Sequence, residues 1–137
     1  MARKDLTEKE ANFVRWQRVA RVATVDATGM PHVVPVCPVY DGGKIYFATE
    51  NNKKVRNLRA NPKMALAFDE YTEVWESLRG LVVRGKAARM IEEGPEFRRL
   101  QGLFYEKFPQ YPTAAGGVTE GDTLIVEVKI EGVAGEV

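Results

Sequence analysis

Residues 46–58, with the sequence YFATENNKKVRNL, decide the fold interpretation, because a strand pattern changes to a helix pattern within them. Apolar residues on Lys44–Thr49 alternate between two faces, as in a half-buried β-strand. After a short polar loop, Val55 and Leu58 are three residues apart among polar neighbours, which is typical of a short amphipathic helix. Asn61-Pro62 ends this helix. The stretch therefore predicts a strand, a tight polar loop and a helix.

The start of this helix carries the clearest candidate binding site. A helix N-terminus offers free backbone N–H groups and the positive end of a dipole, which suit a phosphate. Lys53 and Lys54 add two full charges there, and Thr49 adds a hydroxyl donor. The stretch thus predicts a phosphate pocket, and the alternative is a solvated basic helix face.

Working outward, apolar patterns predict five further strands and two further helices. Hairpin connections outnumber βαβ units, so the sheet is expected to be mainly antiparallel. Six strands in a chain of this size favour a small closed barrel, because closure removes exposed edges. The remaining predicted elements are a helix over residues 7–18, strands over Val19–Asp26, Val33–Tyr40, Met64–Phe68, Leu81–Met90 and Thr123–Ile130, and a helix that begins at Pro95.

The strand over Val33–Tyr40 is unusual because it contains Pro35 and Pro38. Proline has no N–H and cannot donate to a sheet ladder. This segment is therefore expected to be an edge strand, to be bulged, or to open toward a ligand.

The composition excludes several classes of protein. The 137 residues fit one domain, residues 1–137, and a net charge of +1 gives no global attraction to nucleic acid or membrane. Cys37 and His32 are the only cysteine and histidine, so neither a disulfide within the chain nor a Cys/His zinc site is expected. No apolar run reaches the length of a membrane span, and a cytoplasmic location is expected.

Three segments resemble the pyridoxamine 5′-phosphate oxidase-like superfamily of split-barrel proteins. They are Ala23–Val36, Lys53–Leu66 and Leu81–Ala87, and the similarity extends over roughly residues 8 to 112. No one segment is decisive, but all three occur in the family's order and spacing. The resemblance implies a six-stranded antiparallel split β-barrel, mainly β with short helices, that forms a homodimer with a flavin-type cofactor at the interface.

The resemblance also implies which residues bind the cofactor. A basic pair at the position of Lys53 and Lys54 binds the cofactor phosphate in such proteins. The strand before it supplies Phe47, Ala48 and Thr49, and the second strand lines the ring through the backbone of Pro35, Val36 and Cys37.

Departures from the family pattern limit the expected reaction. True pyridoxamine 5′-phosphate oxidases have an FMN-contacting glutamine near the position of Gly80, and a C-terminal Trp and Arg-Leu motif that does not occur here. Vitamin B6 is therefore not the expected substrate. Phe68–Trp75 and the following Leu78-Arg79 resemble the subgroup that uses the deazaflavin F420.

The expected function is that of an FMN-binding oxidoreductase acting on an unknown small molecule, with no catalytic side chain and no metal. Hydride or electron chemistry belongs to the cofactor. Three alternatives stay open: an F420-dependent reductase on the same fold, a non-catalytic flavin- or haem-binding module with His32 as the axial ligand, and a structural dimer.

Aromatic residues outside these segments allow two interpretations each. Tyr71 and Trp75 stack on the ring or pack at the dimer interface. The cluster from Phe104 to Tyr111 belongs to the core or interface, or borders the substrate pocket.

Overall fold

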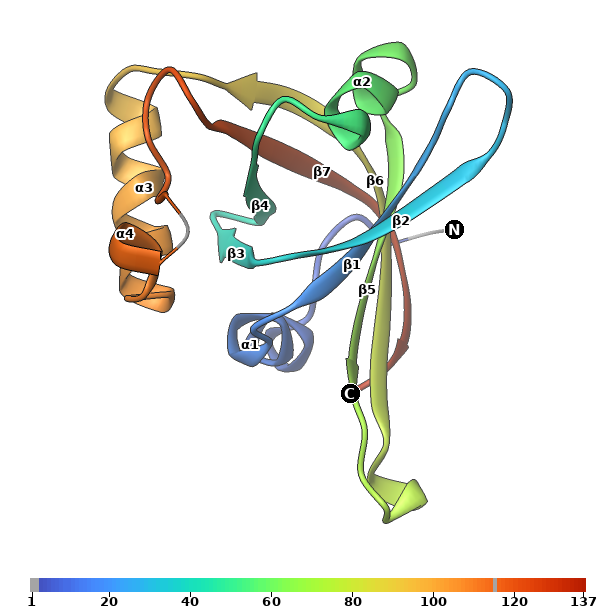
Figure 1. Ribbon diagram of the computed structural model, residues 1–137. Helices are drawn as coiled ribbons and strands as arrows, with labels where there is room; N and C mark the ends of the chain where they lie inside the picture. The colour runs from blue at the N-terminus through green and yellow to red at the C-terminus, as the bar shows by residue number, and fades with distance from the viewer. Residues whose placement is uncertain (1–2, 115) are drawn as a thin grey trace.

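A computed structural model describes residues 3–114 and 116–137, which form a curled antiparallel sheet of seven strands with short helices around it (Figure 1). The strand order is β2-β1-β5-β6-β7-β4-β3. The strands are β1 (Ala20–Val25), β2 (Pro31–Val36), β3 (Pro38–Asp41), β4 (Lys44–Thr49), β5 (Lys63–Glu70), β6 (Arg79–Ile91) and β7 (Leu124–Glu136). The helices are α1 (Glu8–Trp16), α2 (Lys53–Ala60), α3 (Pro95–Lys107) and α4 (Tyr111–Ala114), with a 3₁₀ turn, η1 (Trp75–Ser77).

The two edge strands of the sheet, β2 and β3, follow one another in the chain. Val36 ends β2 and pairs with Ala20 of β1, whereas Pro38 begins β3 and pairs with Phe47 of β4. Only Cys37 lies between them. The sheet therefore curls until one residue of chain connects its two edges, as in a split barrel.

The prediction of six strands is wrong, because the predicted strand Val33–Tyr40 is two strands. The chain leaves the ladder with β1 and joins the ladder with β4 near Pro35 and Pro38, which have no N–H to donate. The prediction that this segment lies at an edge is confirmed for both parts. The mainly β architecture with short helices is also confirmed.

Strand β4 separates two hydrophobic clusters. Ile45 and Phe47 belong to the cluster inside the curled sheet. Tyr46 belongs to a second cluster, which includes Phe104 of α3 and against which Ala48 packs. Burying a side chain as large as Phe47 contributes about 1.5–3 kcal/mol, so these two clusters position β4 and the loop that follows it.

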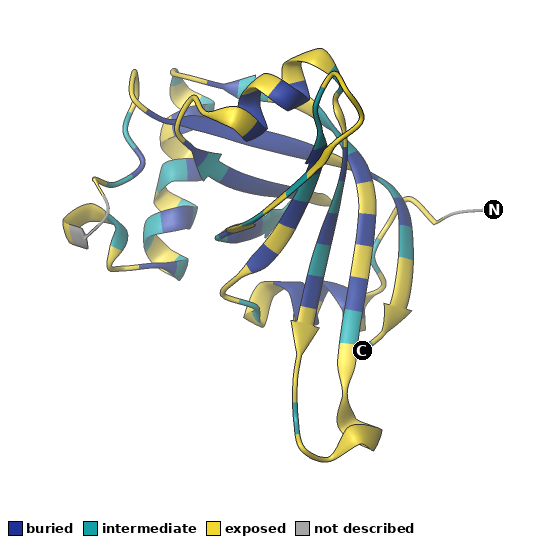
Figure 2. Cartoon of the chain, turned by 45° about the vertical axis from the view of Figure 1, so that its right-hand side comes forward, coloured by how far each residue is buried: buried dark blue, intermediate teal, exposed yellow. Residues whose placement is uncertain are grey.

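The hairpin formed by β5 and β6 projects from the sheet, and η1 forms its tip (Figure 1). Tyr71 and Trp75 are exposed there, and most of the tip is exposed in Figure 2. Further along β6, the pairing with β7 shifts register between Arg84 and Gly85.

No helix in residues 3–114 and 116–137 combines the length and the apolar character needed to cross a bilayer.

Candidate functional site

The two lysines at the start of α2 have different surroundings. Lys53 is half-exposed, and its Nζ lies 3.8 Å from a carboxylate oxygen of Asp26. Lys54 is buried, and its Nζ donates to Thr49 Oγ1 at 2.6 Å and to Asn52 Oδ1 at 3.2 Å. Consecutive helix residues point about 100° apart, so the two ammonium groups cannot share one pocket equally.

Within the described residues, the buried Lys54 ammonium has neutral hydrogen-bond partners and forms no ion pair at 4.0 Å or less. Burial lowers the pKa of Lys54, and the more distant Glu50 opposes this effect only in part. A buried charge without an opposite charge is costly. An anion bound beside Lys54 would supply the missing charge.

The N-terminus of α2 adds to this site. Asn52 is the N-cap residue, yet its side chain accepts from Lys54 and makes no capping bond to the helix backbone. The first turn contains no acidic side chain. The free N–H groups and the dipole of α2 therefore add to the attraction that Lys54 exerts on an anion.

A cavity of about 440 Å³ opens beside these groups, a size within the range of small-molecule sites. Six of the eight residues predicted to bind a cofactor line it. They are Pro35, Val36, Cys37, Ala48, Thr49 and Lys54. The other two do not: Phe47 is fully buried in the core, and Lys53 points to Asp26.

The far side of the cavity was not predicted from the sequence. Residues 116–123, without a helix or strand of their own, contribute Gly116, Gly117, Thr119, Asp122 and Thr123, and Tyr111 lies beside them. We call the part from 116 to 123 the wall segment. Gly117 has a φ of 73°, and a Cβ there would lie 2.8 Å from the Tyr105 hydroxyl. The paired glycines were the sequence signal for a close backbone approach.

Helix α3 fixes the wall segment in place. The Tyr105 hydroxyl donates to the Val118 carbonyl oxygen and accepts from the Val118 N–H, each at 3.0 Å. Gln101 Nε2 donates to the same carbonyl oxygen. The Val118 side chain is fully buried, so the wall segment is bound through both backbone and side chain.

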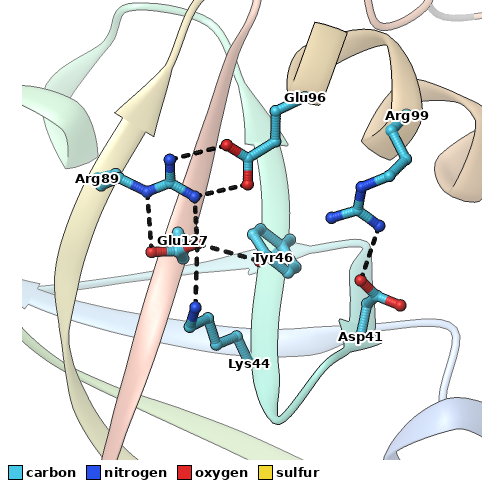
Figure 3. Close-up of polar contacts among 7 residues, drawn as sticks. All are labelled: Asp41, Lys44, Tyr46, Arg89, Glu96, Arg99 and Glu127. Carbon is cyan, nitrogen blue, oxygen red and sulfur yellow. Dashed lines mark hydrogen bonds and ion pairs between the residues drawn. The ribbon is translucent and has the colours of Figure 1, made fainter.

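A second polar cluster lies at the other end of the β4–β7 ladder (Figure 3). Glu127 is buried and accepts from Tyr46 at 3.0 Å and from Arg89 at 2.7 and 3.1 Å, while Lys44 Nζ lies 3.8 Å away. Arg89 also donates to Glu96 of α3 at 2.6 and 2.8 Å. Opposite charges compensate one another here, so the cluster connects α3 to the sheet.

The pKa values in this cluster agree with a structural role. Hydrogen bonding from Arg89 lowers the pKa of Glu127, although burial opposes it. Burial and the Glu127 carboxylate raise the pKa of Tyr46 to about 12. Glu127 is therefore a stable carboxylate and Tyr46 a stable neutral donor near neutral pH.

Other residues considered from the sequence lie away from the cavity lining. His32 is on edge strand β2, where it pairs with Thr24. Tyr71 and Trp75 are at the hairpin tip, joined by a 3.4 Å hydrogen bond. In the part of the chain that the structure describes, His, Cys, Asp and Glu side chains form no group of three or more that could bind a metal.

The fold and the cavity together define a split-barrel protein with a pocket suited to an anion. A family model described as pyridoxamine 5′-phosphate oxidase matches residues 6–135. The chain therefore belongs to the pyridoxamine 5′-phosphate oxidase family, and the resemblance seen in the sequence is confirmed.

The chain is also similar to individual proteins of several kinds. The chain is 34% identical over 98 residues to a 5a,11a-dehydrotetracycline/5a,11a-dehydrooxytetracycline reductase of Streptomyces rimosus, covering 67% of this chain and 69% of the reductase. The haem storage protein HutZ of Vibrio cholerae superposes with a TM-score of 0.79 and 20% identity, over 96% of this chain and 95% of HutZ. An F420 reductase superposes with a TM-score of 0.71 and 21% identity, over 94% of this chain and 98% of the reductase. At these identities the two structures establish the shared fold.

Proposed function

We propose that the protein binds FMN in this cavity and acts as a flavin-dependent oxidoreductase on a small molecule other than vitamin B6. The observation that carries the proposal is the buried Lys54 ammonium beside the uncapped N-terminus of α2, which has no ion-pair partner among the described residues. A phosphate ester supplies both the negative charge and the acceptor oxygens that these groups need. Bound FMN would supply the hydride or electron chemistry.

Two neighbouring groups prepare Lys54 for this role. Thr49 Oγ1 accepts from Lys54 Nζ and donates to the Glu50 carbonyl oxygen at 2.9 Å, so its own proton is already engaged. Asn52 Oδ1 accepts a second Lys54 proton. In the proposal Thr49 acts on the phosphate mainly by positioning Lys54, and one ammonium proton stays available for a phosphate oxygen.

Carboxylates around the cavity favour FMN over F420. Glu50 and Asp122 line it, and Asp122 also borders a neighbouring hollow of about 240 Å³ with Glu92 and Glu93. F420 carries an anionic glutamyl tail, which these carboxylates would repel. FMN has no such tail.

The relatives suggest which reaction class to test, since one of them is by its name a reductase of 5a,11a-dehydrotetracycline and 5a,11a-dehydrooxytetracycline. Activity on vitamin B6 is disfavoured because Gly80 replaces the glutamine that contacts FMN in the true oxidases. Gly80 is the second residue of β6, pairs with Asp69 and Glu136, and offers no side chain to a ligand.

The direct test titrates the purified protein with FMN, F420 and haem separately, followed by absorbance and fluorescence quenching. Tight FMN binding supports the proposal. Preferential F420 binding would replace it with a deazaflavin reductase. Haem binding that His32→Ala abolishes would replace it with the haem module.

We also propose that the protein is a homodimer. Val33, Ala23 and Ala65 lie side by side on the outer face of β2, β1 and β5, where Val33 is 60% exposed. A hollow of about 480 Å³ on this face is lined by Ala23, Ala65 and neighbours, and exposed apolar patches of this kind mark interfaces. Pro35 of the same edge strand lines the cavity, so a second copy here would border the cofactor site.

Sedimentation velocity tests this arrangement. We expect a dimer for the wild type and a monomer with weakened FMN binding for Val33→Glu. A wild-type monomer that binds FMN tightly would remove the dimer from the proposal while leaving the cofactor in it.

A further inference from the structure

Two tyrosines next to the cavity use their hydroxyl groups differently. The rings of Tyr105 and Tyr111 are 6.4 Å apart. The Tyr105 hydroxyl is fully engaged with Val118. Tyr111 lines the cavity, and within the described residues the hydrogen-bonding neighbour of its hydroxyl is the Cys37 thiol, a weak acceptor. A ligand oxygen or nitrogen can replace this weak acceptor, whereas the Tyr105 hydroxyl is already satisfied.

The Tyr111 ring is held in a fixed orientation by aromatic packing. The ring of Phe104 meets it edge-on at 6.2 Å, and that of Phe108 does so at 5.8 Å. The Tyr111 N–H also donates to the Phe108 carbonyl oxygen at 3.0 Å. A side chain packed in this way presents its hydroxyl at a defined place and loses little entropy when it donates.

Tyr111 and Lys54 lie on different sides of the end of β4. Tyr111, Cys37 and Ala48 all pack against the cluster under α3. Thr49, which contacts Lys54, is the next residue after Ala48, and successive strand residues point to opposite faces. The cavity therefore extends around the end of β4, with the anion-binding groups on one side and Tyr111 on the other.

The protonation state of Tyr111 suits a donor. Burial raises the pKa of its hydroxyl, and the neighbouring Cys37 thiol adds to this. The phenol therefore keeps its proton throughout the physiological pH range.

We propose that the Tyr111 hydroxyl recognises the ring of the cofactor by donating a hydrogen bond to one of its acceptor atoms, a carbonyl oxygen or a ring nitrogen. This inference rests on the proposed function, because it assumes that the phosphate lies beside Lys54. The ring then extends past Ala48 and Cys37 toward Tyr111. Tyr111 is a cofactor-recognition residue, and Lys54 is the phosphate-recognition residue.

The test measures affinity for FMN and for riboflavin, which has the ring but no phosphate, in the wild type, Tyr111→Phe and Lys54→Met. Loss of one neutral hydrogen bond in Tyr111→Phe should lower the affinity for both flavins about 5-fold and leave the preference for FMN over riboflavin unchanged. Lys54→Met should lower the affinity for FMN and leave the affinity for riboflavin unchanged. The flavin absorption band should also shift in Tyr111→Phe, because a bond to the ring changes its electronic surroundings.

Tyr46→Phe is the matched control, since it removes the same atom from a hydroxyl that donates to Glu127 and belongs to a residue outside the cavity lining. It should lower thermal stability and leave the absorption band of bound flavin unchanged. Wild-type affinities and an unshifted band in Tyr111→Phe would overturn the assignment while leaving FMN binding intact. A wild type that binds neither flavin would overturn the proposed function, and the assignment with it.

Discussion

Lys54 and Glu127 are both charged and buried, but their surroundings differ. Tyr46 of β4 pairs with Glu127 in the β4–β7 ladder. Thr49, which accepts a hydrogen bond from Lys54, lies three residues after Tyr46 on the same strand, about 10 Å from it. Glu127 is surrounded by Arg89, Lys44 and a tyrosine hydroxyl. Within the described residues, Lys54 donates to two neutral oxygens, and the Glu50 carboxylate is more distant. The comparison separates a charge that stabilises the fold from one that is set up for a ligand.

Removing Glu127 should have the largest effect. Glu127→Ala leaves the Tyr46 hydroxyl and part of Arg89 without a partner, and we expect the free energy of unfolding to fall by about 3 kcal/mol in urea denaturation. Asp41→Ala is the control, because it breaks an exposed 2.9 Å pair with Arg99 and should cost about 0.5 kcal/mol (Figure 3). Equal losses in the two variants would contradict a structural role for Glu127.

Removing Lys54 should affect binding and spare stability. Lys54→Met loses a charge-assisted hydrogen bond to phosphate, so FMN binding should weaken by about 1.5–3 kcal/mol in a fluorescence titration. The unfolding free energy of the cofactor-free protein should change little, because a buried charge is removed together with its hydrogen bonds. Lys53→Met, at the neighbouring exposed position, should weaken FMN binding less. A larger loss with Lys53→Met would reverse the assignment of the two lysines.

Tyr46→Phe tests the Glu127 cluster with a smaller change than Glu127→Ala. It removes one hydrogen bond and leaves Glu127 with Arg89 and Lys44, so we expect a loss of about 1 kcal/mol in unfolding free energy. FMN affinity should not change, because Tyr46 does not line the cavity. A fall in FMN affinity without a fall in stability would show that the two sites are coupled.

The smallest expected effect is a pH dependence of the stability of the cofactor-free protein. The pKa of Lys54 is lower in the folded protein than in the unfolded chain, so between these two values the unfolded chain binds more protons. The stability of the cofactor-free protein should therefore gain a contribution as pH rises through this range below 10.5. Chemical denaturation of wild type and Lys54→Met at pH 7 and pH 10 measures it. A wild-type gain no larger than that of Lys54→Met would contradict the burial of the charge.

Local patterns predicted much of the fold. Alternation identified β4, and the change to a helix pattern after it identified α2. The division of Val33–Tyr40 at Cys37 was not predictable in the same way, because it depends on how far the sheet curls. Pro35 and Pro38 indicated that this segment lies at an edge of the sheet, but they did not indicate that both edges of the sheet meet in it.

Part of the candidate site was also predictable from local patterns. The end of a strand, the start of a helix and two lysines indicated the stretch around Thr49 and Lys54. Which lysine enters the cavity depends on the rotation of α2, which the sequence leaves open. The wall segment comes from a distant part of the chain, brought to the cavity by Tyr105 and Gln101 of α3. No local pattern encodes such a contact.

The consecutive edge strands also bear on aggregation. An open sheet presents two rows of unpaired N–H and C=O groups, which can recruit strands from other molecules. Here both edges belong to one short segment, β2 and β3, and prolines at 31, 35 and 38 remove donors from it. Replacing these prolines would restore donors to both edges. The segment that faces the cavity therefore also protects the molecule against uncontrolled strand addition.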